Sequence, residues 1–376
     1  MNVPRLSRLA RVLLLACLAA APLASARAAE PASAVDPRPL DPAIWSRKAI
    51  SYSGYREGQS PATGVHPTRE QIFEDLTLLR EAGFGLIRLY GAQDHGRAVV
   101  ETIAERGLDI RVQLGAYVAH SMEKNGEANR RELDAAIELA NAHPDIVAAV
   151  SVGNEVLVSW SFVPVPPAEL MGHLAEVRAR VRQPITVNDN WEPYAAAPGS
   201  AIAAVWGLID YASIHTYAYW DAGFELWDFR RLDTPEPQRA RAMMDSAAAY
   251  ARKNFASVRA ALDAAGRRIP IVVGETGWQS RPSAYLNEAK VKDFARHQGH
   301  PANQAMYFTD MMAWAYGKDG YAPGDGFARP AAMFYFSAFD EPWKNADDNW
   351  GLWDAARVRK AATGEAVFFR APASAE

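Results

Sequence analysis

The chain has 376 residues, a length expected for one large domain or two small ones. Hydrophobic residues make up 49% and charged residues 22%, which is typical of soluble globular proteins and excludes disorder, collagen-like repeats and a coiled coil. The formal net charge is −4, so the chain has no excess of positive charge that would favour binding to nucleic acid. The single cysteine excludes a disulfide framework and a cysteine-based zinc site.

The N-terminal 28 residues have the pattern of a secretory signal peptide. Three arginines precede an apolar run at residues 12–23, and small-x-small cleavage sites follow at 24–28. The apolar run is too short to span a membrane, and no later stretch is long enough, so we expect no membrane span. We therefore expect residues 1–28 to be cleaved and the mature chain to be secreted or periplasmic. A lipoprotein attached through Cys17 is the less favoured alternative, because few apolar residues precede this cysteine.

The remainder of the chain divides into a Pro/Ala-rich linker at 29–45 and one domain at 46–376. Short β-branched or apolar runs predict strands at residues 49–55, 86–91, 109–117, 146–156, 184–190, 211–219, 270–278 and 332–341. Helical patterns lie between them, for example at residues 68–82, 128–142, 168–182, 239–265 and 302–316. This alternation predicts the α/β class, and eight pairs fit a single (β/α)8 TIM barrel. An open doubly wound sheet is the alternative, but the first strand lacks a glycine-rich phosphate turn.

Two glutamates stand near the ends of predicted strands, where a barrel carries its active site. Glu155 closes the fourth strand and Glu275 the seventh, and both follow apolar runs in which an unpaired charge is costly. A structural ion pair with Arg88 is the alternative explanation for one such residue. Two carboxylates at the same end of the barrel favour a chemical role.

The fourth and seventh strands lie on opposite sides of a barrel mouth, so the two carboxylates can face each other. Paired carboxylates across a small gap are the machinery of glycoside hydrolysis. One must stay protonated to donate to the leaving oxygen, and the other must stay ionised to attack the anomeric carbon. Asn154 is placed to hydrogen-bond a sugar hydroxyl, and Arg88 to hold the nucleophile ionised.

Six segments carry a family resemblance over roughly residues 48–355. They are YSGYREGQSP (52–61), IRLYG (87–91), VGNEVL (152–157), VVGETGWQS (272–280), PANQAMY (301–307) and FYFSAFDEPWK (334–344). The sequence thereby resembles glycoside hydrolase family 17, and most closely its bacterial secreted β-1,3-glucanases and glucanosyltransferases. It departs from the plant-like family pattern at two places. Residues 347–352 contain no glutamate, and Gln279 stands where a proline is usual.

The resemblance implies a retaining double displacement on β-1,3-glucan, with Glu155 as acid/base and Glu275 as nucleophile. We expect no cofactor, no metal and a monomer. Together with their places at the strand ends, the resemblance indicates the substrate-binding residues Tyr52, Arg88, Tyr90, Asn154, Tyr217, Trp278, Glu341 and Lys344. The scattered histidines support no metal site, and we expect His215 to be a hydrogen-bonding barrel residue.

Long segments after the fourth, sixth and seventh strands bear on the mode of attack. They span 157–167, 220–238 and 279–301, well beyond the usual length of a βα loop. Aromatic residues in and near such loops suggest sugar-stacking platforms: Trp160, Trp220, Trp227, Trp343, Trp350 and Trp353. Loops that close off one end of a substrate cleft favour attack at a chain end, and aromatic residues that hold an acceptor sugar favour transfer. An endo-acting β-glucanase, a β-1,4-glucan or mannan hydrolase of the same barrel group, and an inactive carbohydrate-binding barrel are the alternatives.

Overall fold

A computed structural model describes residues 34–120, 125–225, 236–281, 299–317 and 324–360. The predicted signal peptide lies outside these residues. Residues 34–41 have no regular secondary structure and lead into a short helix, α1 (Pro42–Trp45), whose Trp45 is buried. The last residues of the predicted linker therefore pack as part of the domain. No helix in the described part of the chain is long and apolar enough to cross a membrane.

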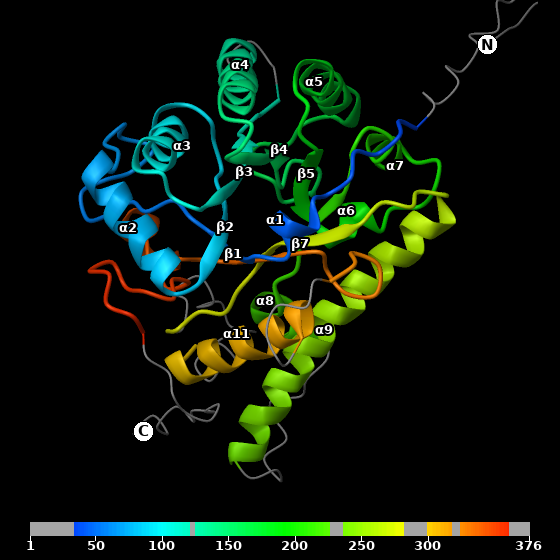
Figure 1. Cartoon of the computed structure of the whole chain (residues 1–376). Helices are drawn as coiled ribbons and strands as arrows, with labels where there is room; N and C mark the ends of the chain where they lie inside the picture. Colours follow the sequence, from blue (N-terminus) through cyan, green and yellow to red (C-terminus); the bar gives the residue numbers. More distant parts are fainter. Residues whose placement is uncertain (1–33, 121–124, 226–235, 282–298, 318–323, 361–376) are drawn as a thin grey trace, which may run out of the picture. The chain divides into compact units, whose positions relative to one another are not determined.

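Eight parallel strands close into a barrel in chain order, with β1 pairing β8 (Figure 1). They are β1 (Lys48–Ser51), β2 (Phe84–Arg88), β3 (Arg111–Ala116), β4 (Val147–Asn154), β5 (Ile185–Asn190), β6 (Ala212–His215), β7 (Ile271–Thr276) and β8 (Met333–Tyr335). The predicted TIM barrel is confirmed. Nearly every strand residue is buried, as expected when side chains fill the barrel on one side and helices cover it on the other.

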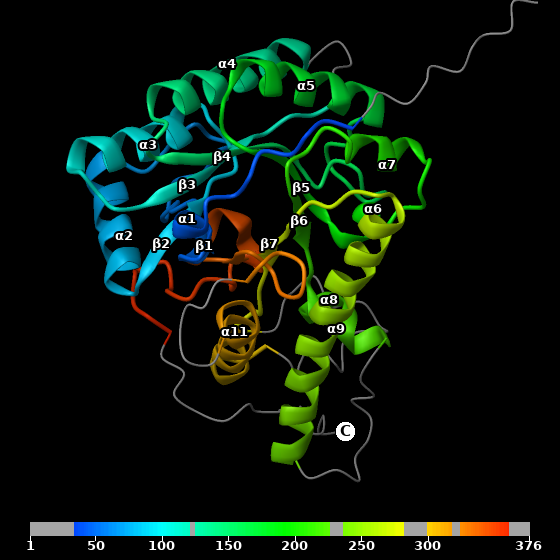
Figure 2. The same ribbon diagram turned by 45° about the vertical axis from the view of Figure 1, so that its right-hand side comes forward.

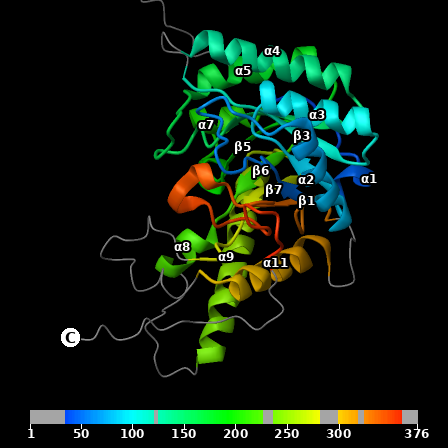
Figure 3. The same cartoon turned by 90° about the vertical axis from the view of Figure 1, so that its left-hand side faces the viewer.

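The longer helices surround the barrel. They are α2 (Arg69–Glu81), α3 (Asp94–Arg106), α4 (Gly126–Ala142), α5 (Pro167–Arg180), α9 (Glu236–Ala264) and α11 (Pro301–Tyr316). Helices α4 and α5 run side by side in Figure 2, and α11 lies beside α9 in Figure 3. The start predicted for α2 is confirmed, because Thr68 accepts from the Gln71 N–H and Gln71 returns the bond in a capping box.

Short helices occupy the connections: α6 (Trp191–Tyr194), α7 (Ala201–Val205), α8 (Ala218–Glu225) and the 3-10 helix η2 (Pro342–Asp347). Helix α8 corrects one predicted strand, because the chain turns helical at Ala218 and β6 ends at His215. The eighth strand was also predicted too long. Strand β8 ends at Tyr335, and residues 337–340 hydrogen-bond mainly to the segment 350–353, although the Ala338 N–H still donates to the carbonyl of Ser51 at the end of β1.

The strands predicted at 86–91, 109–117 and 270–278 also end one to three residues early, at Arg88, Ala116 and Thr276. Backbone conformation explains the ends of the first and fourth strands. Gly54 has φ +76°, so the first strand cannot continue to residue 55 and ends at Ser51. Gly153 (φ +88°) and Glu155 (φ +49°) likewise end β4 in a sharp turn. Both turns lie at the C-terminal end of the barrel, so the breaks in strand geometry occur where the predicted site residues are.

Candidate active site

A cavity of about 1030 Å³ opens at the C-terminal ends of the strands. Seven of the ten predicted site residues line it: Tyr52, Tyr90, Asn154, Glu155, Tyr217, Glu275 and Lys344. The other three, Arg88, Trp278 and Glu341, are buried behind its walls. The barrel thus brings together residues that lie more than 200 positions apart in the sequence.

Glu275 ends in a cage of donors at the bottom of this cavity. Its side chain is only 7% exposed and receives a charged hydrogen bond from Arg88, which is itself buried. The Tyr90 hydroxyl donates to Glu275 Oε1 at 3.0 Å, and the Tyr217 hydroxyl donates to Oε2. Arg88 also donates to Asn154 Oδ1 and to the Gly274 carbonyl at 3.1 Å. The guanidinium therefore links the ends of strands β2, β4 and β7.

The cage keeps Glu275 ionised. Burial by itself would raise the pKa of this carboxyl, but His215, Arg88 and the Tyr217 hydroxyl together outweigh burial and lower the pKa to about 2. The pKa values of the two phenols shift in the opposite direction. Burial and the neighbouring negative charge raise the pKa of Tyr90 and of Tyr217 well above its usual value, so both remain hydrogen-bond donors.

Replacing Arg88 by methionine is expected to move the acidic limb of the kcat/KM pH profile upward. Without the guanidinium, Glu275 binds a proton more readily, and losing a close cation raises a carboxyl pKa by about one to three units. Arg88→Lys keeps the charge and is expected to leave the limb nearer its wild-type position. The measurement is a pH–rate series on variants shown to be folded by circular dichroism.

Arg180→Met supplies the matched control for this prediction. Arg180 pairs with Asp134 and Glu176 on the exposed surface, so its loss removes the same charge far from Glu275. An acidic limb that stays in place in a folded Arg88→Met variant would restrict Arg88 to a structural role.

Glu155 has a different environment from Glu275. Its side chain is 33% exposed to the cavity, and its Oε1 lies 3.0 Å from Nδ1 of His215. The backbone at Glu155 is left-handed, an uncommon conformation for a residue with a side chain, and its N–H donates to the Asn188 carbonyl at 2.9 Å. The turn directs the carboxylate into the cavity instead of along the strand.

His215 lies between the two carboxylates, which the sequence did not indicate. Its Nδ1 is 3.0 Å from Glu155 and 3.8 Å from Glu275 Oε2, and its side chain is fully buried. His215 does hydrogen-bond within the barrel, as predicted. The available signal was its spacing from Tyr217, because residues two apart at a strand end point to the same side.

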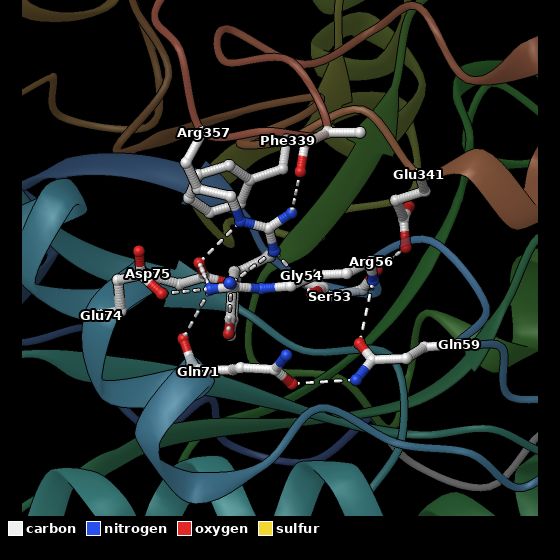
Figure 4. Close-up of polar contacts among 12 residues, drawn as sticks. Ser53, Gly54, Arg56, Gln59, Gln71, Glu74, Asp75, Phe339, Glu341 and Arg357 are labelled. Atoms are coloured by element: carbon white, nitrogen blue, oxygen red, sulfur yellow. Dashed lines mark hydrogen bonds and ion pairs between the residues drawn. The ribbon is translucent and has the colours of Figure 1, made fainter.

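The wall formed by the first and eighth strands contains Glu341 and Lys344. Ser53 and the Trp343 indole donate to Glu341 Oε1, and Lys344 pairs with Oε2, so Glu341 is fully engaged by its neighbours. Figure 4 shows Ser53 reaching Glu341 from the loop after β1. Lys344 also contributes to the cavity wall, which leaves it accessible to a ligand.

The buried carboxylate of Asp75 is at the centre of the contacts that hold the loop after β1 (Figure 4). The Tyr52 hydroxyl donates to Asp75 at 3.2 Å, which turns its polar end away from the cavity that its ring lines. Arg357 donates to both Asp75 oxygens and, at 2.7 Å, to the Gly54 carbonyl. The segment near the C-terminus therefore fixes the loop that carries Ser53.

Only some of the predicted aromatic platforms line the cavity. Trp160, Trp220, Trp343 and Trp350 line the cavity, and Trp160 is 51% exposed. Trp353 is buried, and Trp227 lies outside the described residues. Trp278 is fully buried and packs against Tyr219 and Tyr307, so we expect it to support the wall and not to touch substrate.

No group of three or more histidine, cysteine, aspartate or glutamate side chains in the described part of the chain is arranged to hold a metal ion. The two carboxylates and the phenols of Tyr90 and Tyr217 line the cavity instead, with Arg88 and His215 buried behind them. Carboxylates with unlike surroundings at a barrel mouth can act as a proton donor and a nucleophile.

Comparison with known proteins assigns the chain to a family. The model of the BtgE/BtgC glycoside hydrolase domain matches residues 49–352. A glucan 1,3-beta-glucosidase of Arthroderma benhamiae is 27% identical over 324 residues, which cover 82% of this chain and 88% of that protein.

Two solved structures are similar to the barrel. An endo-laminarinase from Formosa Hel1_33_131 has 25% identity and a TM-score of 0.71, covering 82% of this chain and 84% of its own. A glycoside hydrolase family 17 beta-1,3-glucanosyltransferase from Rhizomucor miehei has 18% identity and a TM-score of 0.59, covering 86% and 99%, which supports the fold. These similarities confirm the resemblance found in the sequence. The family match spans the barrel and both cavity glutamates, and the chain belongs to the BtgE/BtgC glycoside hydrolase domain family.

Proposed function

We propose that this glycoside hydrolase cleaves β-1,3-glucan with retention of configuration and transfers glucosyl units to acceptor sugars. The unlike environments of the two cavity glutamates carry the proposal. Glu275 is buried and held ionised by Arg88, whereas Glu155 is partly exposed beside His215. The choice of a β-1,3 linkage is supported by the relatives named above, two of which are described as acting on β-1,3-glucans or laminarin.

The reaction follows from these positions. The ionised Glu275 carboxylate attacks the anomeric carbon, while the Glu155 carboxyl gives its proton to the departing glycosidic oxygen. Glu155 is then a carboxylate and takes a proton from a water or sugar hydroxyl. That oxygen attacks the anomeric carbon and releases Glu275. Arg88, Tyr90 and Tyr217 orient Glu275 and prevent its protonation, and His215 holds Glu155 toward the bond that breaks.

Retention is the stereochemical prediction. One nitrogen of His215 is 3.0 Å from Glu155 and 3.8 Å from Glu275, so the separation of these two oxygens cannot exceed the two distances end to end. This bound is incompatible with most of the range of about 6.5–9.5 Å used by inverting enzymes and compatible with about 5–5.5 Å for retaining ones. Proton NMR of laminarin digestion should show the β-anomer first. Initial release of the α-anomer would contradict the double displacement.

Transfer and chain-end attack form the second prediction. The long segment between β4 and α5 carries Trp160 and Phe162, which are 51% and 99% exposed and line the cavity. Exposed aromatic faces beside the acid/base can hold an acceptor sugar, and holding a reactant lowers the entropic part of its barrier. Laminari-oligosaccharides should therefore give products longer than the starting sugar early in the reaction. A rapid fall in laminarin viscosity with only shorter mixed oligomers would support endo-hydrolysis instead.

The preferred glycosidic linkage distinguishes the proposed β-1,3-glucanase from the remaining alternative. A β-1,4-glucan or mannan hydrolase would use the same pair of glutamates, so the catalytic residues do not distinguish the substrates. Activity on laminarin but not on carboxymethyl cellulose or mannan is expected. The reverse preference would overturn the proposed linkage and leave the two-glutamate chemistry intact.

A further inference from the structure

The turn that presents Glu155 requires support beyond its own strand. Gly153 and Glu155 both have left-handed backbone conformations, and the register between β4 and β5 shifts between Ser151 and Asn154. A non-glycine residue in this conformation is strained and persists only where its surroundings hold it. The carboxylate of Glu155 is aimed by this turn, so whatever holds the turn also aims the carboxylate.

Asp189, near the end of β5, contacts the turn directly. Its Oδ2 accepts the backbone N–H of Leu157 at 2.8 Å, two residues beyond Glu155, and its Oδ1 accepts the Asn190 N–H at 2.8 Å. The preceding residue, Asn188, accepts the N–H of Glu155 itself through its carbonyl. The turn is therefore attached to β5 at two points, and one of these attachments is a fully buried side chain.

We propose that Asp189 is a positioning residue that fixes the Glu155 turn and thereby aims the acid/base. This inference rests on the proposed function, because it assigns Glu155 the proton-transfer role. A buried carboxylate is costly to retain unless its bonds are used. Burial raises the pKa of Asp189 to about 7, while the N–H groups of Leu157 and Asn190 oppose this shift. Asp189 does not line the cavity. Its contact with the Glu155 turn explains why a carboxylate that is costly to bury stands at this position.

Asp210 provides a matched control in the same chain. It is as fully buried as Asp189 and also accepts a backbone N–H of β5, that of Ile185 at 2.8 Å. Asp210 precedes β6, however, and contacts the opposite end of β5, where it pairs with Arg178 at 2.7 Å. The two aspartates share residue type, burial and a hydrogen bond to a backbone N–H of β5, and they differ in distance from Glu155.

The test compares Asp189→Ala, Asp189→Asn and Asp210→Ala on two substrates. Laminari-oligosaccharides need a proton on the leaving oxygen, whereas dinitrophenyl β-laminaribioside loads the enzyme without one. Asp189→Ala is expected to lower kcat on the oligosaccharide by on the order of 10²-fold, the effect of about 1 Å of misplacement. Its dinitrophenol burst should keep the wild-type rate. Asp189→Asn keeps one acceptor oxygen and should recover much of the lost kcat.

Asp210→Ala is expected to lower the melting temperature and leave the ratio of the two activities unchanged. Equal losses on both substrates in folded Asp189→Ala, or the same selective loss in Asp210→Ala, would overturn the positioning role. A wild-type enzyme that leaves laminari-oligosaccharides intact would overturn the proposed substrate instead, so the two failures are distinguishable.

Discussion

Glu275→Ala is expected to lower kcat/KM on laminari-oligosaccharides by on the order of 10⁴- to 10⁶-fold, the scale reached when a covalent nucleophile is removed. No glycosyl-enzyme can form without this carboxylate. The substitution also leaves a small space beside the buried cation of Arg88, which suits a small anion. Added azide should enter this space, attack the anomeric carbon in a single displacement and yield a glycosyl azide of inverted, α configuration.

Glu275→Gln is the companion variant. It removes the negative charge but fills the same volume, so its activity should be equally low and azide should restore little of it. NMR of the azide product and the rate against azide concentration provide the measurements. Appreciable turnover of Glu275→Ala in the absence of azide would show that another group is the nucleophile.

The second large effect is expected from Glu155→Ala. General acid–base groups contribute about 10²- to 10⁴-fold, and a loss in this range is expected on oligosaccharides, whose leaving group needs the proton. A dinitrophenyl glycoside should still load Glu275 and give a burst of dinitrophenol, followed by slow release, because no base activates water. Azide needs no base, so it should accelerate release and give a β-glycosyl azide.

The two azide products provide an internal check on the roles. An α-azide from Glu155→Ala and a β-azide from Glu275→Ala would mean that the roles are exchanged. The surroundings argue for the assignment made here. A nucleophile must remain ionised, and Glu275 is the carboxylate with the buried arginine, the two phenols and the lowered pKa.

The fold was predictable because its main signals are local. Apolar runs, the Thr68 cap and the alternation of eight strand and helix patterns all lie within short windows of sequence. The strand ends were not predictable to the residue. The backbone at Gly54 and Gly153, and the pairing of 337–340 with 350–353, depend on neighbours that are distant in the chain. Helix α8 begins inside a run whose apolar residues also suit a strand.

The candidate site divides in the same way. By itself the sequence determined which two glutamates end the fourth and seventh strands and which arginine accompanies them, because barrel topology assigns strand ends to one face. Only the tertiary structure decided their chemistry. His215 reaches both carboxylates because parallel pairing sets β6 beside β7 and closure curves β4 toward them. Trp278 turns into the core, and Asp189 reaches back to Leu157, because side-chain direction and burial depend on how adjacent strands pack. Desolvation and charge act through space, so the lowered pKa of Glu275 arises only once Arg88 and His215 have been folded against it.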